Sequence, residues 1–204
     1  MTRRVIGLEL DELPVLPSAC RGCVFWELTP EAGRQAAEFG QTELEKEAWI
    51  SAVLLEWGRC GHVAYVDDEP AGYVLYAPPG SVPAVRSFPS GPVGSDAVLL
   101  TALRVEKSHV GNGLGRLLVR EAARDLAGRG VRAVEAFGAE RAAAPCVLPA
   151  AFLRGVGFET VRPHPEWPRL RLELDDAISW KEEVEAALRR LSTGFWAFPT
   201  LQRG

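Results

Sequence analysis

Three glycines that follow an apolar stretch mark the segment of this chain best suited to bind a phosphate group. Gly111, Gly113 and Gly115 stand at every second position, shortly after the apolar residues 97–105. Glycine lets the backbone bend tightly and approach a ligand closely. The helical pattern after the turn would present unpaired N–H groups and the positive end of a helix dipole to an anion. The spacing therefore predicts a phosphate-binding turn at residues 111–115.

Two other phosphate-binding motifs describe this turn less well. A P-loop needs Lys and then Ser or Thr after its last glycine, whereas Arg116 follows Gly115. The dinucleotide fingerprint G-x-G-x-x-G matches Gly111 and Gly113, but its third glycine falls on Arg116. Glu135 stands where that fingerprint has an acidic residue, about twenty positions further on, so a dinucleotide-binding domain stays an alternative. The chain lacks the repeated strand and helix alternation that such a domain needs.

The turn must be positioned by a strand before it and a helix after it. Residues 97–105 form an apolar run typical of a buried strand. The helix after the turn has one apolar face, made by Leu114, Leu117, Leu118, Ala122 and Leu126. Residues 131–137 predict a second strand, parallel to the first because a helix connects them.

Upstream elements are predicted from caps, alternation and composition. Thr42 and Glu45 have the spacing of a capping box, and an apolar stripe follows at Ile50, Val53, Leu54 and Trp57. Residues 62–66 and 71–77 predict two strands of a hairpin with its turn at 67–70. The segment 78–96 is too rich in Pro, Gly and Ser to form a regular element, and we expect it to help shape an acceptor site.

The C-terminal third continues this alternation. We expect a short helix at about 150–156 and a last strand at 169–174. Ser179 and Glu182 then cap a further helix, which an aromatic tail follows. We divide the chain into an N-terminal extension with a first strand (1–30), a central domain (31–176), and a C-terminal helix and tail (177–204).

The glycine turn and its two flanking elements resemble motif A of the GNAT N-acetyltransferases. That motif has Gln or Arg, two residues, Gly, one residue, then Gly or Ala, and the corresponding residues are Val110, Gly111, Asn112, Gly113, Leu114 and Gly115. Gly157 and Phe158, after the short helix, also follow the family order. The resemblance implies an α/β (α+β) fold with a central mixed, mostly antiparallel sheet. This sheet would be splayed between its two parallel middle strands and flanked by helices, with an extra C-terminal helix.

The resemblance further implies that the turn binds acetyl-CoA. The backbone amides of residues 110–115 would hold the pyrophosphate, although Val110 replaces the usual Arg or Gln. Arg116 begins the helix and could reach a phosphate oxygen, which suits guanidinium geometry. The backbone of Leu103 and Val105 would pair with the pantetheine arm as a neighbouring strand does.

The chemistry implied by the resemblance is direct attack of a primary amine on the thioester of acetyl-CoA. An ammonium ion has no lone pair, so a general base must first remove its proton. Glu135, on the strand beside the motif, resembles the catalytic Glu of some peptide-directed members and is our predicted base. Glu106 and Asp96 are alternatives, and Leu99 stands where other members carry the base.

Other residues argue against a catalytic role or against full activity. His62 and His109 are candidates for scaffold or surface roles rather than catalysis. The family often protonates the leaving thiolate with a Tyr in the short helix, and Leu153 holds that position here. A non-catalytic acyl-CoA sensor or interaction protein with the same fold is therefore the alternative to an N-acetyltransferase.

Composition limits the partners. The 204 residues carry a formal net charge of −4 and show no basic stripe, which argues against nucleic acid. No apolar run reaches the length of a membrane span or of a signal peptide core, so we expect no membrane association and a cytoplasmic location. The expected partner is an amine acceptor, either a protein lysine or N-terminus or a small molecule. The C-terminal helix and tail are a candidate contact for a homodimer.

The cysteines leave two alternatives open. Cys20 and Cys23 have zinc-knuckle spacing, and Cys60 with His62 would complete four ligands if the fold brought them together. Without a second C-x-x-C pair, we expect no metal and reduced structural thiols instead. Cys146 has no neighbour in sequence that marks it as a nucleophile.

Overall fold

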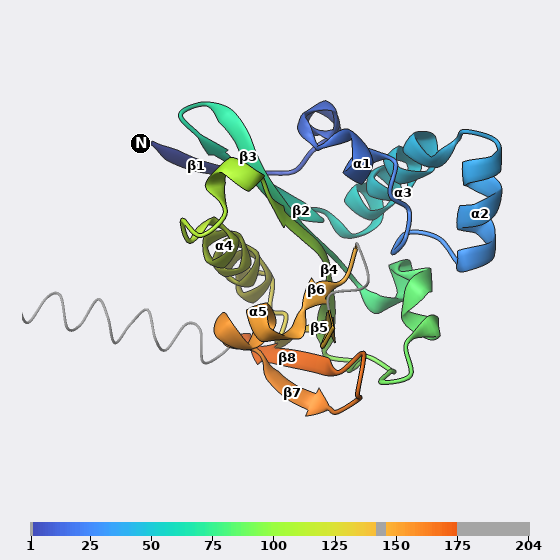
Figure 1. Ribbon diagram of the computed structural model, residues 1–204, viewed down its shortest axis with the longest axis vertical. Helices are drawn as coiled ribbons and strands as arrows, with labels where there is room; N and C mark the ends of the chain where they lie inside the picture. The colour runs from blue at the N-terminus through green and yellow to red at the C-terminus, as the bar shows by residue number, and fades with distance from the viewer. Residues whose placement is uncertain (1, 142–145, 175–204) are drawn as a thin grey trace, which may run out of the picture.

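A computed structural model of the protein describes residues 2–141 and 146–174 (Figure 1). Eight strands form one sheet in the order β1-β2-β3-β4-β5-β8-β7, and β6 pairs with β5. The strands are β1 Arg3–Gly7, β2 Gly61–Val66, β3 Glu69–Ala77, β4 Ala97–Val105, β5 Ala133–Ala139, β6 Leu148–Pro149, β7 Glu159–Arg162 and β8 Arg169–Glu173. The α-helices are α1 Ser18–Arg21, α2 Pro30–Glu38, α3 Thr42–Trp57, α4 Leu114–Gly128 and α5 Ala150–Gly155. Short 3-10 helices span Leu10–Val15, Pro79–Ser81, Pro83–Ser87 and Lys107–His109.

The hairpin of β2 and β3 forms as the alternation predicted. Its turn is Asp67 and Asp68, which both adopt left-handed backbone conformations with φ of 49° and 66°. Aspartate tolerates this region better than most residues, and such turns match the twist of a hairpin. Glu69 and Pro70 belong to β3 rather than to the turn, because they pair with β2.

The middle of the sheet is splayed, as the family resemblance implied. β4 and β5 are parallel and pair only at Ala97 with Ala133, Val98 with Val134 and Leu99 with Glu135. β4 continues to Val105, whereas the first five residues of β5 all pair with β8 on the other side. The remaining sheet pairs are antiparallel, apart from β5 with β6. This topology excludes the dinucleotide-binding alternative, which requires an extended parallel sheet.

The short strand β6 occupies the edge of β5 that β4 leaves. Gly138 and Ala139 of β5 pair with Leu148 and Pro149 of β6. The opposite edge of β5 is already taken by β8 and by Pro168, whose carbonyl accepts a hydrogen bond from Gly138. The gap between the splayed strands is therefore bordered on the β5 side by β6 (Figure 1).

Two hydrophobic cores cover the two faces of the sheet. α4 and α5 lie on one face, and α1 to α3 lie on the other (Figure 1). On the α4 side the apolar positions of the predicted helix face inward, and Leu118 and Leu126 are fully buried. On the α3 side the core contains Ile50 and the stacked rings of Trp26, Phe88 and Phe137.

Several local predictions need correction. Thr42 is the first residue of α3, and its N-cap Gln41 makes no side-chain capping bond, so the predicted capping box is absent. A capping box forms instead between Glu9 and Glu12 in the first 3-10 helix. The segment 78–96 contains two short 3-10 helices, and strand β7 was not predicted.

Two sequence expectations concern membranes and the C-terminus. Within residues 2–141 and 146–174, no helix combines the length and apolar character needed to cross a membrane. The predicted C-terminal helix after Ser179 and the aromatic tail lie outside the described residues.

Candidate active site

The predicted glycine turn overlaps α4, which begins at Leu114 and therefore includes Gly115, whereas Gly111 and Gly113 precede the helix and are open to a ligand. Gly111 and Gly113 have φ of 84° and 77°, a region that side chains disfavour, and a Cβ at either position would meet nothing within 4 Å. Gly113 is the N-cap of α4 and brings no side chain to satisfy the helix. The first helical hydrogen bond runs from the Leu117 amide to the Gly113 carbonyl over 3.1 Å. The amides that precede Leu117 in the first turn therefore suit an anion such as a phosphate.

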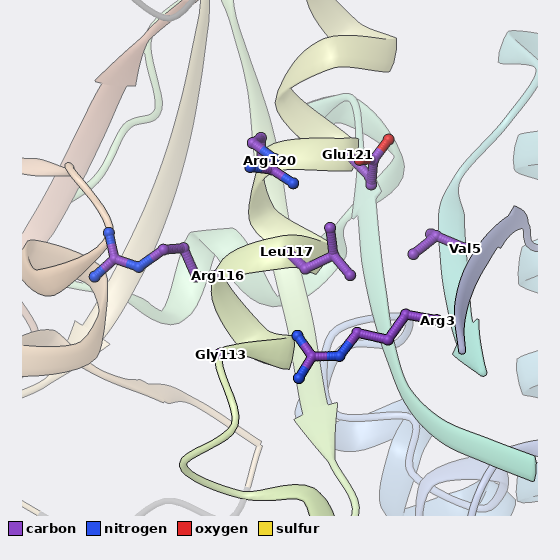
Figure 2. Close-up of a pocket in the computed structure, with 7 residues that line it drawn as sticks. All are labelled: Arg3, Val5, Gly113, Arg116, Leu117, Arg120 and Glu121. Carbon is purple, nitrogen blue, oxygen red and sulfur yellow. The ribbon is translucent and has the colours of Figure 1, made fainter. Parts of the chain in front are cut away.

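Positive side chains surround this turn. A groove of about 520 Å³ runs along the first turns of α4 and is lined by Arg3, Val5, Gly113, Arg116, Leu117, Arg120 and Glu121 (Figure 2). Arg3 reaches toward the helix from β1, more than a hundred residues upstream of the glycines. Sequence reasoning missed Arg3 because no local pattern connects it with the turn. Three guanidinium groups against one carboxylate give the groove a positive charge that favours an anionic ligand.

The predicted coenzyme-binding residues differ in what their side chains do. Leu114 is buried in the core, so only its backbone is available to a ligand. Val110, in contrast, is 66% exposed. Gly115 lies against Phe152 of α5, and a Cβ there would approach the ring to 3.1 Å. Arg116 donates a 2.7 Å hydrogen bond to the carbonyl of Gly155 and points toward α5 (Figure 2).

Asn112 and His109 complete the turn. The Asn112 amide donates to the His109 carbonyl over 3.3 Å, which closes the loop before Gly113. Among the described residues, the Nδ1 atom of His109 is buried and has no hydrogen-bond partner. His109 therefore has a spare polar atom close to the glycines.

The edge of β4 beyond the splay has its backbone groups turned toward the gap. The Glu106 amide donates to the Ala71 carbonyl, so at this position the chain faces β3. Backbone groups alternate in direction along a strand, which places those of Leu103 and Val105 on the opposite edge. Since β5 pairs with β4 only as far as Leu99, this edge is available to an extended ligand.

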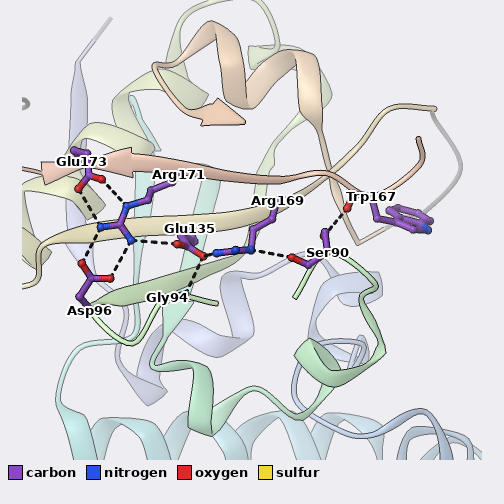
Figure 3. A network of polar contacts seen from close by, with 8 residues as sticks. All are labelled: Ser90, Gly94, Asp96, Glu135, Trp167, Arg169, Arg171 and Glu173. Atoms are coloured by element: carbon purple, nitrogen blue, oxygen red, sulfur yellow. Dashed lines mark hydrogen bonds and ion pairs between the residues drawn. The ribbon is translucent and has the colours of Figure 1, made fainter. Parts of the chain in front are cut away.

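Glu135 lies at the apex of the splay and is almost completely buried. Its carboxylate forms ion pairs with Arg169 and Arg171 of β8, the second over 3.1 Å, and accepts a 3.2 Å hydrogen bond from the Gly94 amide (Figure 3). Both oxygens therefore already have donors. The carboxylate of Glu135 therefore has hydrogen-bonded partners on β8 and another on the segment before β4.

The contacts of Glu135 belong to a larger polar network (Figure 3). Arg171 also binds Asp96 with bonds of 2.9 and 3.0 Å, and Glu173 with bonds of 2.6 and 3.1 Å. The hydrogen bonds that Arg171 donates to Asp96 lower the pKa of Asp96, and those that it donates to Asp96 and Glu173 raise the pKa of Arg171. The network joins β5, β8 and the segment after Pro83–Ser87.

The segment 78–96 is fastened at both ends. The Ser90 hydroxyl donates to the Trp167 carbonyl over 2.6 Å, and the Arg169 side chain donates to the Ser90 carbonyl. Trp49 of α3 donates to the Ser81 carbonyl over 2.6 Å. The segment is therefore part of the scaffold around Glu135, and its expected contribution to acceptor binding stays a prediction.

The other sequence candidates lie in different surroundings. His62 is buried on the α4 face, where its ring lies 3.3 Å from the Tyr76 hydroxyl and burial lowers its pKa. Leu153 is fully buried in the core, and so is Leu99. Glu106 is half-buried where β4 ends. Glu106 is the one carboxylate in this group, and it lies beyond the far end of β4 from Leu99, the residue that pairs with Glu135.

The four proposed zinc ligands do not come together. Cys20 and Cys60 belong to the core on the α3 face, whereas His62 faces Tyr76 and α4 on the other side of the sheet. Within the described part of the chain, no three His, Cys, Asp or Glu side chains form a group that could hold a metal ion. Cys23 instead contacts Cys146, a partner that sequence spacing gave no reason to expect.

Comparison with known proteins agrees with this geometry. The model of the Acetyltransferase (GNAT) family matches residues 24–158. No curated protein sequence matches the chain.

Solved structures share the fold at low sequence identity. The PaiA N-acetyltransferase from Thermoplasma acidophilum, in complex with coenzyme A, is 12% identical with a TM-score of 0.58, over 85% of this chain and 99% of that one. An N-acetyltransferase from Staphylococcus aureus is 14% identical with a TM-score of 0.56, over 85% and 99%. YhbS from Escherichia coli, also in complex with coenzyme A, is 20% identical with a TM-score of 0.50, over 86% and 83%.

Proposed function

Because the chain belongs to the GNAT acetyltransferase family, we propose that it transfers the acetyl group of acetyl-CoA to a primary amine by direct attack. The observation that carries this proposal is one juxtaposition. The open glycine turn at the start of α4 follows the β4 edge that β5 leaves unpaired, with the short 3-10 helix Lys107–His109 between them. An anion cradle beside a free strand edge matches a ligand with a pyrophosphate and an extended amide-containing arm.

The protein's own groups would bind the coenzyme in two sections. The amides of the first turn of α4 would hold the pyrophosphate, and the cations of Arg3 and Arg120 would attract its charge. The backbone of Leu103 and Val105 would exchange hydrogen bonds with the pantetheine amides. Arg116 donates one N–H to the Gly155 carbonyl, so its other guanidinium N–H groups would serve the phosphate site. The coenzyme supplies a thioester whose carbonyl is open to attack by an amine.

Glu135 is the proposed proton acceptor for the incoming amine. Its place at the apex, on the same face as the aromatic core around Phe137, supports this role. Oε2 accepts from Arg169 and the Gly94 amide, whereas Oε1 accepts from Arg171, so Oε1 is the oxygen that would take the proton from the substrate or from a water that leads to it. Arg169 and Arg171 would then act as positioning residues for Glu135.

A non-catalytic acyl-CoA sensor is the second candidate. Two observations favour it: the Glu135 oxygens already have donors, and Leu153 is buried where the family often has a proton-donating Tyr. A missing general acid typically costs about 10²- to 10⁴-fold in rate, so turnover would be slowed rather than abolished. Thiolate is a tolerable leaving group, and the enzyme therefore remains our first candidate.

The acceptor and its setting are proposed from chemistry alone. The net charge of −4 favours attraction of a cationic amine, such as a protein lysine, an N-terminus or a small-molecule amine. We also propose that the protein is cytoplasmic and that it forms a homodimer.

The test combines binding and turnover on the same preparation. Calorimetry with acetyl-CoA would measure binding, and chromatography of free coenzyme A would measure transfer to a panel of amines. Chromatography avoids thiol reagents, which would also modify the protein's cysteines. Binding with release on any amine supports the enzyme. If acetyl-CoA binds but no amine in the panel causes release of coenzyme A, the result supports the sensor. Absence of acetyl-CoA binding contradicts both candidates.

A further inference from the structure

Two cysteines that are far apart in sequence lie in contact beside the splayed strands. The sulfur atoms of Cys23 and Cys146 are 2.7 Å apart, although 123 positions separate the residues in the chain. Cys23 lies between α1 and α2, and Cys146 lies two positions before β6. The Trp26 indole N–H also donates to the Cys146 carbonyl over 2.8 Å, which holds the two segments together next to the sulfurs.

We infer that Cys23 and Cys146 form a reversible disulfide, which makes them a redox-modifiable pair independent of acetyl transfer. Thiols in contact need only a small movement to reach the S–S bond length of about 2.05 Å. Both residues are partly exposed, whereas Cys20 and Cys60 are buried. Accessibility therefore selects this pair from the four cysteines of the chain.

The surroundings of Cys23 favour its thiolate. The hydrogen bond with the Cys146 thiol lowers the pKa of Cys23 to about 6, with smaller help from a backbone hydrogen bond and from Lys46. Lys46 is close because its ammonium group donates to the Cys23 carbonyl over 3.1 Å. The same sulfur contact raises the pKa of Cys146, which holds the shared proton. Burial raises the pKa of Cys60 to about 12, so that thiol stays protonated.

These differences define the order of the reaction with a small-molecule disulfide such as oxidised glutathione. The Cys23 thiolate attacks one sulfur of that disulfide, a mixed disulfide forms and one small-molecule thiolate leaves. Cys146 then loses its proton and its sulfur attacks Cys23, which releases the second small-molecule thiolate. Two protein thiols become one disulfide, and the small-molecule disulfide is reduced to two thiols.

The bond would join the N-terminal segment to the connection that follows β5. Because β6 borders the gap between β4 and β5, the disulfide would fix one wall of that gap to the layer formed by α1 to α3. A cross-link between such distant positions restricts the unfolded chain strongly. We therefore expect the oxidised protein to melt at a temperature several degrees higher than the reduced protein.

Trypsin gives a direct assay of this pair. Cleavage after Arg21 separates Cys20 from Cys23, and the four cysteines fall in four different peptides: 5–21, 22–34, 60–86 and 142–154. The full chain would be equilibrated with oxidised and reduced glutathione, alkylated and digested without reduction. We expect a linked peptide of 22–34 with 142–154 whose abundance follows the glutathione ratio. A link through 5–21, or only mixed disulfides with glutathione, would overturn the inference.

Single substitutions supply the matched controls. Cys23→Ser and Cys146→Ser should abolish the linked peptide and the rise in melting temperature, whereas Cys60→Ser should retain both. Retention of the temperature rise in Cys23→Ser would contradict the inference. If a variant does not fold, alkylation rates of the unsubstituted protein still test the inference. At pH 7, iodoacetamide should alkylate Cys23 at least tenfold faster than Cys60, and equal rates would count against the pair.

Discussion

Leu99 and Glu135 form the last residue pair between β4 and β5, and Glu135 is held from its other side by two arginines of β8. The apex of the splay is therefore fixed by backbone pairing toward β4 and by ion pairs toward β8. A fixed apex keeps the two strands apart at a constant geometry beyond it. A ligand that pairs with the free edge of β4 benefits from this preorganisation.

Replacement of Gly113 should weaken coenzyme binding. Gly113→Glu places a side chain at φ of 77°, fills the open cradle and adds a negative charge where phosphate would bind. We expect the affinity for acetyl-CoA to fall by at least roughly tenfold, or about 1.4 kcal/mol, in calorimetry. Gly130→Glu is the matched control, because Gly130 has φ of 75° beyond the other end of α4. Equal loss of binding in both variants would mean that strain, not the cradle, causes the effect.

Arg3 should contribute to coenzyme attraction through its charge. Arg3→Ala removes one of the cations that line the groove beside Gly113, so we expect KM for acetyl-CoA to rise a few-fold at low ionic strength. The difference should shrink as salt is added, since screening weakens an exposed charge. Arg4→Ala is the control, because Arg4 faces Asp68 and the Tyr65 ring instead. An unchanged KM in Arg3→Ala at low salt would exclude Arg3 from the site.

Glu135→Gln should lower both stability and activity. Loss of the carboxylate leaves two largely buried guanidinium groups without their shared partner, which typically costs about 3 kcal/mol in free energy of unfolding. If Glu135 also accepts the amine proton, kcat/KM should fall by about 10²-fold or more at neutral pH.

Asp96→Asn separates the two roles of Glu135. It weakens the same Arg171 network at an exposed carboxylate and leaves the proposed base intact. Both variants would be compared by denaturant unfolding and by the pH profile of kcat/KM. A Glu135→Gln enzyme that is less stable but keeps the wild-type pH profile would show that Glu135 only positions the site.

His62 should make the protein less stable at mildly acidic pH. Burial lowers the pKa of His62 in the folded state below its ordinary value of about 6.5. As pH falls below that value, the unfolded chain takes up a proton before the folded protein does, so the free energy of unfolding decreases. Denaturant unfolding from pH 7.5 to 5 should show a steeper loss for the wild type than for His62→Gln. Parallel curves would contradict the prediction.

Removal of one member of the buried Lys46–Glu27 ion pair should destabilise the protein more than replacement of both members by apolar residues. The Lys46 ammonium lies 2.5 Å from Glu27, and within the described residues the second Glu27 oxygen has no hydrogen-bond partner. Lys46→Met strands a buried carboxylate and should cost about 3–5 kcal/mol. The double variant Lys46→Met with Glu27→Leu should recover most of that loss in thermal or denaturant unfolding. A double variant as unstable as the single one would refute this view.

Sequence predicted the parts of the site that are continuous in the chain. The strand, glycine turn and helix between residues 97 and 128 follow from periodicity and from the positions of Gly111 and Gly113. The second parallel strand follows from the helical connection, because a crossover of this length returns the chain in the same direction. These local patterns, with the family resemblance, were sufficient for the fold class.

The rest of the site depends on pairings between distant segments. Glu135 meets Arg169 and Arg171 only because β8 returns antiparallel beside β5, and Arg3 reaches α4 only because β1 is added at the sheet edge. Cys23 meets Cys146 for a similar reason. Local patterns can also mislead. The capping box predicted at Thr42 is absent because the N-cap of the helix is Gln41, one residue earlier than the motif assumed.

The short pairing between β4 and β5 at the centre of the sheet is also the weakest connection within the sheet. Three residue pairs join β4 to β5, while the hairpin strands on one side and β8 on the other are paired along their lengths. Cooperative units of unfolding tend to end at such seams. A ligand seated in the gap would act as a missing strand between the two halves. Binding of a ligand there would therefore make the two halves of the sheet unfold more cooperatively.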